Sequence, residues 1–406
     1  MAESNRILEG IKVLDVASFI AAPAAATVMA DFGADVIKVE PPGRGDTYRH
    51  RMIGPGYPES DVAHHWIMDN RNKRGIIVDL KTDEGREVLL RLVAEADVFI
   101  TNMPLPVRER LRIRWQDMRP VNERLIYGSV TAYGEAGVEA DHTGFDSTAL
   151  WARSGLMDLV KPAPDAPPGR SMPGMGDHPT AISLFGGIMA ALYRRERTGK
   201  GTLVQTSLIA NGLWWNALQV QAVLCGGVVP RRPPREEAVN PLNNLYVARD
   251  GQWFQLVMLT QEDRWAEFAE CIGMPELADD PRFADTASRV ENASALTELM
   301  DQAFLAADLA HWRERLAAGG FTFGVIRRVE DIPDDPQMRA SGALTPIEDE
   351  RAGAELTVDS PLWIEGAEKV APMLAPGHGE HTDEVLAEFG YAAEEIAKLR
   401  DSGAVG

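Results

Sequence analysis

The chain has 406 residues, of which 45% are hydrophobic and 25% charged, as in ordinary globular proteins. Its formal net charge of −20 argues against nucleic acid or an anionic membrane as a partner, because both are bound largely through surplus Lys and Arg. The apolar runs are shorter than the roughly 20 residues that span a bilayer. We therefore expect a soluble protein of two domains, since one ordinary core rarely serves a chain of this length.

The N-terminus and the cysteines predict a cytoplasmic location. The first residues, MAESNRILEGIKVLDV, lack the basic start, long apolar stretch and small-residue cleavage site of a secretory signal. With Cys225 and Cys271 alone, the sequence offers no disulfide framework. A reducing compartment is therefore expected.

The N-terminal half alternates short β-branched runs with helical patterns, which predicts a mainly parallel sheet covered by helices. The expected strands cover 11–17, 35–40, 74–80, 97–103 and 124–133. An Ala-rich helix is expected to end at Gly33, and further helices are expected at 82–96 and 180–199. The Pro- and Gly-rich stretch 159–179 predicts irregular structure.

Composition changes after residue 224, where CGGVVPRRPPREEAVNP is typical of a linker. Beyond it, 244–259 predicts a hairpin that turns at Asp250-Gly251, and two helices follow. A last capped helix is expected at 379–390. The predicted organisation is a large domain over 1–225, a linker over 226–239, a small α+β domain over 240–328, and a segment over 329–406 that returns to the large domain.

Two common nucleotide-binding motifs are missing from the sequence. The first strand runs into ASFIAAPAAA, which has no G-x-G-x-x-G, so a nicotinamide enzyme is disfavoured. The stretch TGKGT has Gly-Lys but no glycine five positions earlier, and we interpret it as a surface turn rather than a P-loop.

No metal site is predicted, because clustered ligands are missing. His64 and His65 are adjacent and would point apart, while His378 and His381 fall in a polar loop, where capping or solvated roles are expected. A G-x-S-x-G nucleophile elbow is also missing, and neither cysteine has a reactive context. Carboxylates remain as the plausible class of nucleophile.

Basic residues cluster where the second and third expected strands begin or end, a suitable place for phosphates in an open α/β sheet. They are Arg44, Arg49, His50, Arg51, Arg71, Lys73 and Arg74. The alternative for each is a solvated face that balances nearby acids.

Asp177 lies in PGMGDHPTAI, between a glycine and an apolar helical pattern. Spacing alone favours a helix cap, because Asp is among the commonest capping residues and Pro179 suits an early helical position. The same position also suits a nucleophile. Free N–H groups and the positive end of the helix are expected to keep a partly desolvated carboxylate ionised, and Gly174 and Gly176 would admit a bulky substrate.

The opening LEGIKVLDVASFIAAPAAATVMADFGADVIKVEPPGRGD resembles the class III (CaiB/BaiF) CoA-transferases. The similarity continues through NRNKRGIIVDLKTDEG, GFDSTALWARSG, GMGDHPTAISLFGGIMAALYRRERTGKG, DGQWFQL, DDPRF and GEHTDEVLAEFG, so that it spans essentially the whole chain. It implies a Rossmann-like large domain formed by both chain ends, a small domain, and two subunits interlocked as rings in an obligate homodimer.

For the chemistry, the resemblance implies that Asp177 is the catalytic nucleophile and becomes an aspartyl-CoA thioester while CoA passes from an acyl-CoA to a free organic acid. Tyr133 matches an active-site tyrosine. No cofactor is held permanently, since CoA enters as a substrate. GFDSTALWARSG with GMGDHPT looks most like members that act on 2-hydroxy or aryl-substituted acids.

The resemblance also implies a set of CoA contacts. They are Ser18, Phe19, Ala21, Arg44, Asn72, Lys73, Arg74, Asn102, Met103, Arg110, Gly144, Phe145 and Asp146. Two departures stand out, because Pro104 and Pro41 replace arginines of relatives. The phosphate charge is then expected to be met by Arg44, Lys73, Arg74 and Arg110.

Two alternatives stay open. Racemases of the superfamily carry a His in a G-H-D block where this chain has Phe145, so an α-carbon racemase would need Asp146 or His178 as its base. An acyl-CoA-binding protein without catalysis is the other alternative. The glycine-rich lid of formyl-CoA transferase has no clear counterpart, and Gly226-Gly227 are weak substitutes.

Overall fold

The computed structural model describes residues 5–50, 57–259 and 261–406, so Arg51 lies outside the described residues. The chain divides into two compact units. The larger unit comprises Met1–Leu156, Arg170–Gln221 and Gln337–Gly406, and the smaller unit comprises Met157–Gly169 and Ala222–Pro336. The domain boundaries expected from composition stay a prediction.

A six-stranded sheet forms the centre of the larger unit. Every pair of neighbouring strands is parallel, and the order is β3-β2-β1-β4-β5-β6. This confirms the predicted α/β class with a mainly parallel sheet. The strands are β1 (Lys12–Asp15), β2 (Asp35–Glu40), β3 (Arg74–Ile77), β4 (Val98–Thr101), β5 (Ile126–Thr131) and β6 (Thr202–Ser207).

Successive strand residues point to opposite faces of this sheet, and both faces are buried. Val13 joins the apolar cluster on one face, and the next residue, Leu14, joins the cluster on the other. Val98 and Phe99 alternate in the same way. Helices on both faces explain why the strands are apolar throughout rather than alternating with polar residues.

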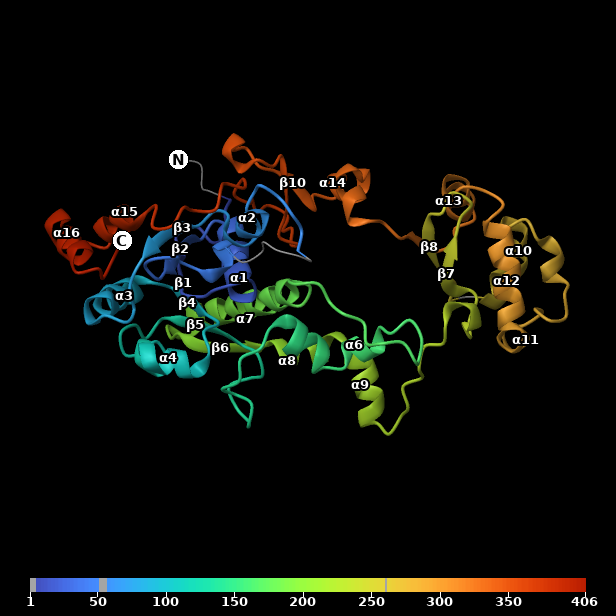
Figure 1. Ribbon diagram of the computed structural model, residues 1–406, viewed down its shortest axis with the longest axis horizontal. Coiled ribbons are helices and arrows are strands. Elements are labelled where there is room, and N and C mark those ends of the chain that lie inside the picture. Colours follow the sequence, from blue (N-terminus) through green and yellow to red (C-terminus); the bar gives the residue numbers. More distant parts are fainter. Residues whose placement is uncertain (1–4, 51–56, 260) are drawn as a thin grey trace. The chain divides into compact units, whose positions relative to one another are not determined.

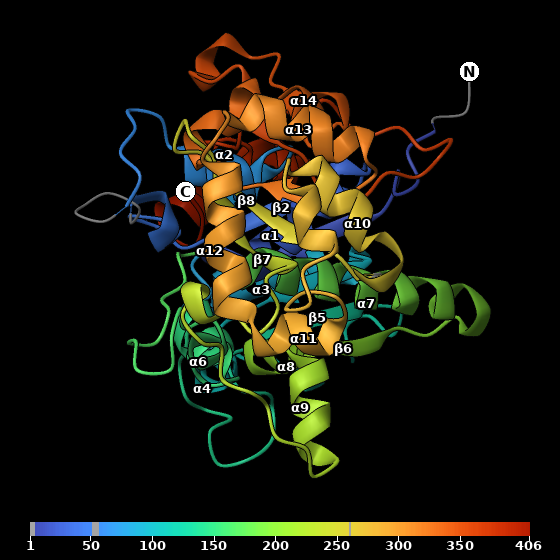
Figure 2. The same cartoon turned by 90° about the vertical axis from the view of Figure 1, so that its right-hand side faces the viewer.

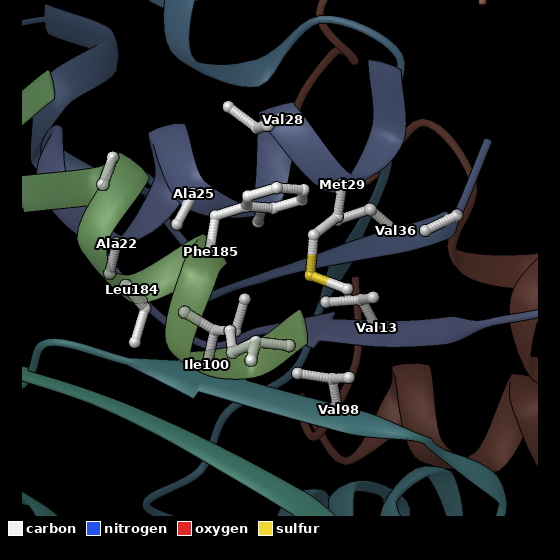
Figure 3. Close-up of a cluster of buried hydrophobic side chains, with 14 of the residues drawn as sticks. Val13, Ala22, Ala25, Val28, Met29, Val36, Val98, Ile100, Leu184 and Phe185 are labelled. Carbon is white, nitrogen blue, oxygen red and sulfur yellow. The ribbon is translucent and has the colours of Figure 1, made fainter. Parts of the chain in front are cut away.

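Helices α1 (Ala21–Asp31) and α7 (Asp177–Thr198) lie side by side over the first face (Figure 1). All residues of α1 are buried, and its alanines allow α7 to approach closely. Figure 3 shows Leu184 and Phe185 of α7 packed among side chains of α1 and the strands, with Leu184 near Ala22 and Met29 between Phe185 and Val13. This packing fixes the N-terminal ends of both helices at the same edge of the sheet.

The second face is covered by α3 and by two helices from the C-terminal part of the chain, α15 and α16, whose apolar residues join one cluster with the strands. The further helical segments of the larger unit connect strands or form its edge. The bounds are η1 (Thr47–His50), α2 (His64–Asn70), α3 (Asp83–Glu95), α4 (Leu105–Leu111), α5 (Trp115–Met118), the π-helical segment η2 (Asp146–Ala152), α8 (Leu208–Trp215), α14 (Pro336–Ala340), η6 (Glu350–Ala352), α15 (Thr382–Glu388) and α16 (Ala393–Asp401). A short antiparallel pair joins β10 (Leu344–Pro346) to β11 (Leu356–Val358). Across the described ranges, no helix has both the length and the apolar character needed to cross a membrane.

The smaller unit has a three-stranded antiparallel sheet, β7-β8-β9, covered by helices that share one apolar core (Figure 2). The predicted hairpin at Asp250-Gly251 is confirmed, with Gly251 at a φ of 79°. The bounds are α6 (Leu156–Leu159), α9 (Ala217–Leu224), η3 (Arg235–Glu237), β7 (Asn243–Val247), β8 (Trp253–Val257), α10 (Gln261–Cys271), η4 (Pro275–Ala278), α11 (Thr286–Glu291), α12 (Ala293–Phe304), α13 (Leu309–Ala318), β9 (Phe323–Val325) and η5 (Val329–Asp334). The helices α6, α9 and α14 cross the division between the units.

Candidate active site

A cavity of about 560 Å³ opens in the larger unit at the carboxyl ends of its parallel strands. Residues that directly follow β1, β4 and β6, and the last residues of β5, line it. The main lining side chains are Ser18, Phe19, Ile20, Tyr48, Tyr57, Asn102, Met103, Pro104, Leu105, Thr131, His142, Phe145, Asp146, Ser147, Asp177 and Leu208. In open α/β sheets, ligands bind at this edge, where the strand order reverses.

The turn after β1 and the turn after β4 are tied together at that reversal. The backbone N–H of Ser18 donates to Oδ1 of Asn102 at 2.9 Å, and Nδ2 of Asn102 donates to the carbonyl of Ser18 at 2.6 Å. The amide side chain therefore acts as a clip between two neighbouring strands. It holds the start of α1, whose free N–H groups favour a negatively charged ligand, against the cavity.

Asp177 is the first residue of α7, and Gly176 is the N-cap. No side-chain cap hydrogen bond is formed there, so the expected capping role of Asp177 is wrong. The half-buried carboxylate faces the cavity. Burial and the neighbouring charge of Asp146 raise the pKa of Asp177 to about 7, in spite of the opposing charge of His178. A pKa of about 7 leaves the carboxylate only partly ionised at neutral pH. The expectation that the helix end favours its ionised form stays a prediction.

Asp146 holds the loop that carries Asp177. Its Oδ2 accepts from the backbone N–H of Gly176 at 3.2 Å, and its Oδ1 accepts from that of Ser147 at 2.6 Å. A Cβ at position 176 would lie 2.9 Å from Cδ1 of Leu150 and 3.0 Å from the Asp146 Cβ, so a side chain there would crowd this contact. Gly174, at a φ of 87°, makes the turn that precedes it.

A second carboxylate lies behind Asp177. Asp69 of α2 is 1% exposed and pairs with the half-buried His178, whose Nε2 is 2.8 Å from Oδ1. The hydroxyl of Tyr48 donates to the other oxygen of Asp69 at 2.9 Å. Burial and the adjacent Asp69 carboxylate raise the pKa of Tyr48 well above its usual value. Tyr48, Asp69 and His178 thus form a continuous hydrogen-bonded chain beside the cavity.

Aromatic side chains form part of the cavity wall near Asp177. Phe19 packs edge-on against Phe145, with ring centroids 5.7 Å apart, and lies 6.1 Å from the ring of Tyr48. Phe19 adopts a φ of 62°, which is uncommon for a bulky residue. The wall therefore offers apolar rings to a substrate.

The structure brings most of the predicted site residues together at the cavity. These are Asp177, Ser18, Phe19, Ala21, Asn102, Met103, Gly144, Phe145 and Asp146. Tyr133 lies just behind the lining, because a Cβ on Gly144 would meet its ring and hydroxyl at 3.1 and 3.2 Å. The cavity wall formed by described residues contains no Lys or Arg.

Three predicted ligands have other partners. The Lys73 ammonium is buried and donates to Asp15, Asn70 and the carbonyls of Pro23 and Asp69 at 2.8 to 2.9 Å. Arg74 pairs with Asp35, Glu384 and Glu388.

The third, Asn72, donates to Asp31 and accepts from the backbone N–H of Met373. Arg44 and Arg110 are exposed, and within the described ranges neither forms an ion pair. Lys73 and Arg74 therefore have structural contacts, and the phosphate role expected of Arg44 and Arg110 stays a prediction.

Lys73 belongs to a buried ion cluster beneath the strand ends, made of Asp15, Lys38, Asp46 and Lys73. Lys38 lies 3.0 Å from Asp46 and 3.7 Å from Asp15, and also donates to the carbonyl of Ala17. Burial lowers the pKa of Lys73 to about 8. Asp46 in turn accepts from the backbone N–H of Tyr48, so the cluster supports the cavity wall.

Sequence reasoning missed Tyr48 and Asp69 as site residues. Asp69 stands among histidines and basic residues in HHWIMDNRNK, where it reads as a counter-charge. Its role depends on α2 and α7 meeting across 109 residues of sequence, and no local pattern encodes that contact.

The chain matches the family model described as CoA-transferase family III over residues 8–382, and it belongs to that family. The chain is therefore a CoA-transferase, an enzyme that uses CoA thioesters as substrates.

Named relatives agree with this class. The chain is 33% identical to (R)-2-hydroxy-4-methylpentanoate CoA-transferase of Clostridioides difficile, over 98% of this chain and 99% of that one. It is 29% identical to cinnamoyl-CoA:phenyllactate CoA-transferase of Clostridium sporogenes, over 98% and 97%. The crystal structure of a CaiB/BaiF family protein from Brucella suis matches with a TM-score of 0.83 and 31% identity, over 95% of this chain and 100% of that one.

Proposed function

We propose that this CoA-transferase moves CoA from an acyl-CoA to a free organic acid through a thioester on Asp177. The observation that carries the proposal is the state of that side chain. It is a half-buried carboxylate facing the cavity, with no hydrogen-bond partner among the described residues and a pKa raised to about 7. A poorly solvated carboxylate of this kind is a better nucleophile than an exposed one.

In the first half of the reaction, an Asp177 oxygen attacks the carbonyl carbon of the acyl-CoA. The C–S bond breaks, and CoA leaves as a thiolate, with an acyl-aspartyl anhydride on the enzyme. The thiolate then attacks the Asp177 carbonyl carbon of the anhydride. This step forms the aspartyl-CoA thioester and releases the donor acid as a carboxylate.

In the second half, the acceptor carboxylate attacks the Asp177 thioester and displaces the thiolate. The thiolate then attacks the acceptor carbonyl of the new anhydride, which yields the new acyl-CoA and restores the Asp177 carboxylate. No step consumes a proton or an external energy source. The apolar wall is needed because water would hydrolyse the anhydrides.

We propose a 2-hydroxy acid with a branched or aryl side chain as the acceptor. The two relatives named above act on (R)-2-hydroxy-4-methylpentanoate and phenyllactate, as their names state. The rings of Phe19 and Phe145 at the cavity wall suit an apolar side chain of this kind. Phe145 cannot exchange a proton, so a racemase would have to use Asp146 or His178 as its base.

The CoA part of the substrate is proposed to contact the turns tied by Ser18 and Asn102, with Tyr133 close behind the reacting carbonyl. Arg44 and Arg110 are proposed to meet the phosphates. The exposed guanidinium of each has no carboxylate partner within the described ranges, which supports this assignment.

We also propose the homodimer with interlocked subunits. Support comes from α8 and the start of α9 in the larger unit, where Trp214 and Leu218 are 78% and 79% exposed. Leu213 and Trp215 lie beside them and are also exposed. Large apolar side chains that are this exposed are typical of an interface between proteins. Light scattering of the wild type should give twice the monomer mass. A variant that carries both Trp214→Glu and Leu218→Glu should not dimerise and should give the monomer mass.

The decisive test is mass spectrometry after mixing the enzyme with acyl-CoAs and reducing with borohydride. The panel should include acyl-CoAs of branched and aryl 2-hydroxy acids together with short-chain ones. Reduction of an aspartyl thioester turns the Asp177 carboxyl into an alcohol, and the altered peptide is identified by fragmentation. An adduct elsewhere, or none with any donor, would reject the proposal.

A control without an acceptor acid separates transfer from isomerisation. The enzyme is incubated with a chiral 2-substituted acyl-CoA in deuterium oxide. A CoA-transferase leaves the α-hydrogen in place, whereas a racemase exchanges it for deuterium. Asp177→Ala should abolish adduct formation and transfer together.

A further inference from the structure

A histidine is directly next to Asp177 in the chain, yet it does not line the cavity. His178 is 40% exposed, and its Nε2 pairs with Asp69 at 2.8 Å. The other ring nitrogen faces the loop, since a Cβ on Gly174 would lie 3.4 Å from Nδ1 and 3.3 Å from Cε1. The ring is therefore fixed on both sides by groups other than substrate.

The partner carboxylate is itself fixed. Asp69 is 1% exposed, and the Tyr48 hydroxyl donates to its second oxygen at 2.9 Å. A buried carboxylate that accepts from a phenol and faces an imidazole favours the protonated ring. Burial alone would lower the pKa of His178, but the hydrogen bond to Asp69 and the charges of Asp69 and Asp177 raise it above its usual value.

The charges that face Asp177 come from three elements. Asp146 of η2 and Asp69 of α2 are negative, and His178 of α7 supplies the positive charge. Tyr48 of η1 stays neutral beside them. Without the imidazolium, burial and two carboxylates would all favour the protonated, unreactive form of Asp177.

We propose that His178 is a positioning residue of the transfer reaction, held as a cation by the Tyr48–Asp69 pair so that Asp177 stays ionised for attack on the thioester. This inference rests on the proposed role of Asp177 as nucleophile. His178 acts through charge and without contacting the substrate. The Tyr48–Asp69 pair fixes both its tautomer and its place.

The test compares His178→Gln with His178→Arg. Glutamine can keep a hydrogen bond to Asp69 but carries no charge, whereas arginine keeps the charge. The measured quantity is the rate of Asp177 thioester formation in a single turnover, followed by mass spectrometry between about pH 5 and 9. His311→Gln, in the smaller unit, is the matched control and should leave the pH profile unchanged.

In the wild-type enzyme, the rate of thioester formation should rise with pH, with a midpoint at about 7, as the Asp177 carboxyl ionises. In His178→Gln, this rise should move up by about one pH unit, since an opposite charge nearby shifts a carboxyl by about that much or more. The variant should then be roughly tenfold slower near pH 6 and equal to wild type at high pH. His178→Arg should restore the wild-type profile.

An equal loss of rate at every pH in His178→Gln, or a wild-type profile for it, would overturn the inference. So would an unrestored profile in His178→Arg, provided that its thermal unfolding matches that of the wild type. The proposed function fails separately, if the wild-type enzyme forms no adduct at Asp177 at any pH. The two failures are therefore distinguishable in one experiment.

Discussion

Two buried groups of charges lie within the larger unit, and they are built differently. The ion cluster of Asp15, Lys38, Asp46 and Lys73 has one ammonium for each carboxylate. The carboxylate cluster has three carboxylates, Asp69, Asp146 and Asp177, and one imidazole, His178.

The balanced cluster has contacts for both of its ammonium groups and lies outside the cavity, as a support for the strand ends. Two members of the unbalanced cluster, Asp146 and Asp177, line the cavity, and the pKa of Asp177 is raised to about 7. A surplus of negative charge lowers the stability of the fold and shifts the pKa of a reactive carboxyl group. The balanced cluster therefore supports the fold, and the unbalanced cluster belongs to the site. Removing a charge should lower the stability of the fold in the balanced cluster and raise it in the unbalanced one.

Replacing Asp177 by Asn should have the largest effect on activity. Loss of the nucleophile should lower turnover by at least about 10³-fold, as for other residues that form a covalent intermediate. The variant should nevertheless be more stable than the wild type above pH 7. Steady-state transfer assays and urea unfolding at several pH values measure both effects.

The sign of the stability change follows from linkage. The folded pKa of Asp177, about 7, is above its unfolded value near 3.8, so ionisation opposes folding progressively between these values. The gain in Asp177→Asn should be absent at low pH and should reach at most about 4 kcal/mol above pH 7, at 1.36 kcal/mol per pKa unit. A variant less stable than the wild type at pH 8 would contradict the contrast between the clusters.

Lys38→Met should show the reverse behaviour. Removing one ammonium leaves Asp15 and Asp46 buried without their shared partner, and breaking a buried ion pair in this way costs about 3–5 kcal/mol. Urea unfolding should report this loss at neutral pH. Lys12→Met is the control, because the Lys12–Glu95 pair is exposed and its removal should cost under about 1 kcal/mol.

Much of the fold could be predicted from the sequence, because the elements carry strong local signals. The expected strand at 35–40 is Asp35–Glu40 in the structure, and the Ala-rich helix gives way at Gly33, which has a φ of 98°. The expected strand at 11–17 is shorter, Lys12–Asp15, because Val16 and Ala17 already begin the turn to α1. The turns decide where a strand ends, and the hydrophobic periodicity of the sequence does not indicate that position.

The site was predictable in part, for a different reason. Residues directly after strands, such as Ser18 and Asn102, must meet at one edge of a parallel sheet. The fate of a charged side chain depends on the partners that folding brings to it. Lys73 and Arg74 are next to a strand end as expected, but Asp15 and Asp35 bind them. Nothing in NRNKRG distinguishes a ligand from a buried counter-charge.

Asp146→Asn should sharpen the comparison by reducing the surplus charge in the carboxylate cluster. The charge of Asp146 is one of the causes that raise the pKa of Asp177, so its removal should lower that pKa. The rise of kcat/KM with pH should then move down by about one pH unit. An asparagine keeps an acceptor for the N–H of Gly176. An unchanged or upward-shifted profile would show that Asp146 does not act on Asp177 through its charge.

The smallest expected effect concerns a cation outside both clusters. Because Lys73 is engaged in the ion cluster, we propose that exposed arginines such as Arg110 meet the phosphate charge. Arg110→Ala should raise KM for acyl-CoA about three- to tenfold with kcat unchanged, since the contact is equally present in ground and transition states.

The increase should shrink at high salt, because exposed charges are screened. Arg119→Ala, at the end of α5, is the matched control and should leave KM unchanged. An equal response of the two variants would mean that Arg110 acts only through net charge. The phosphates would then have to contact a charge from one of the buried clusters. In that case the ion cluster would belong to the binding site and would not only support the fold.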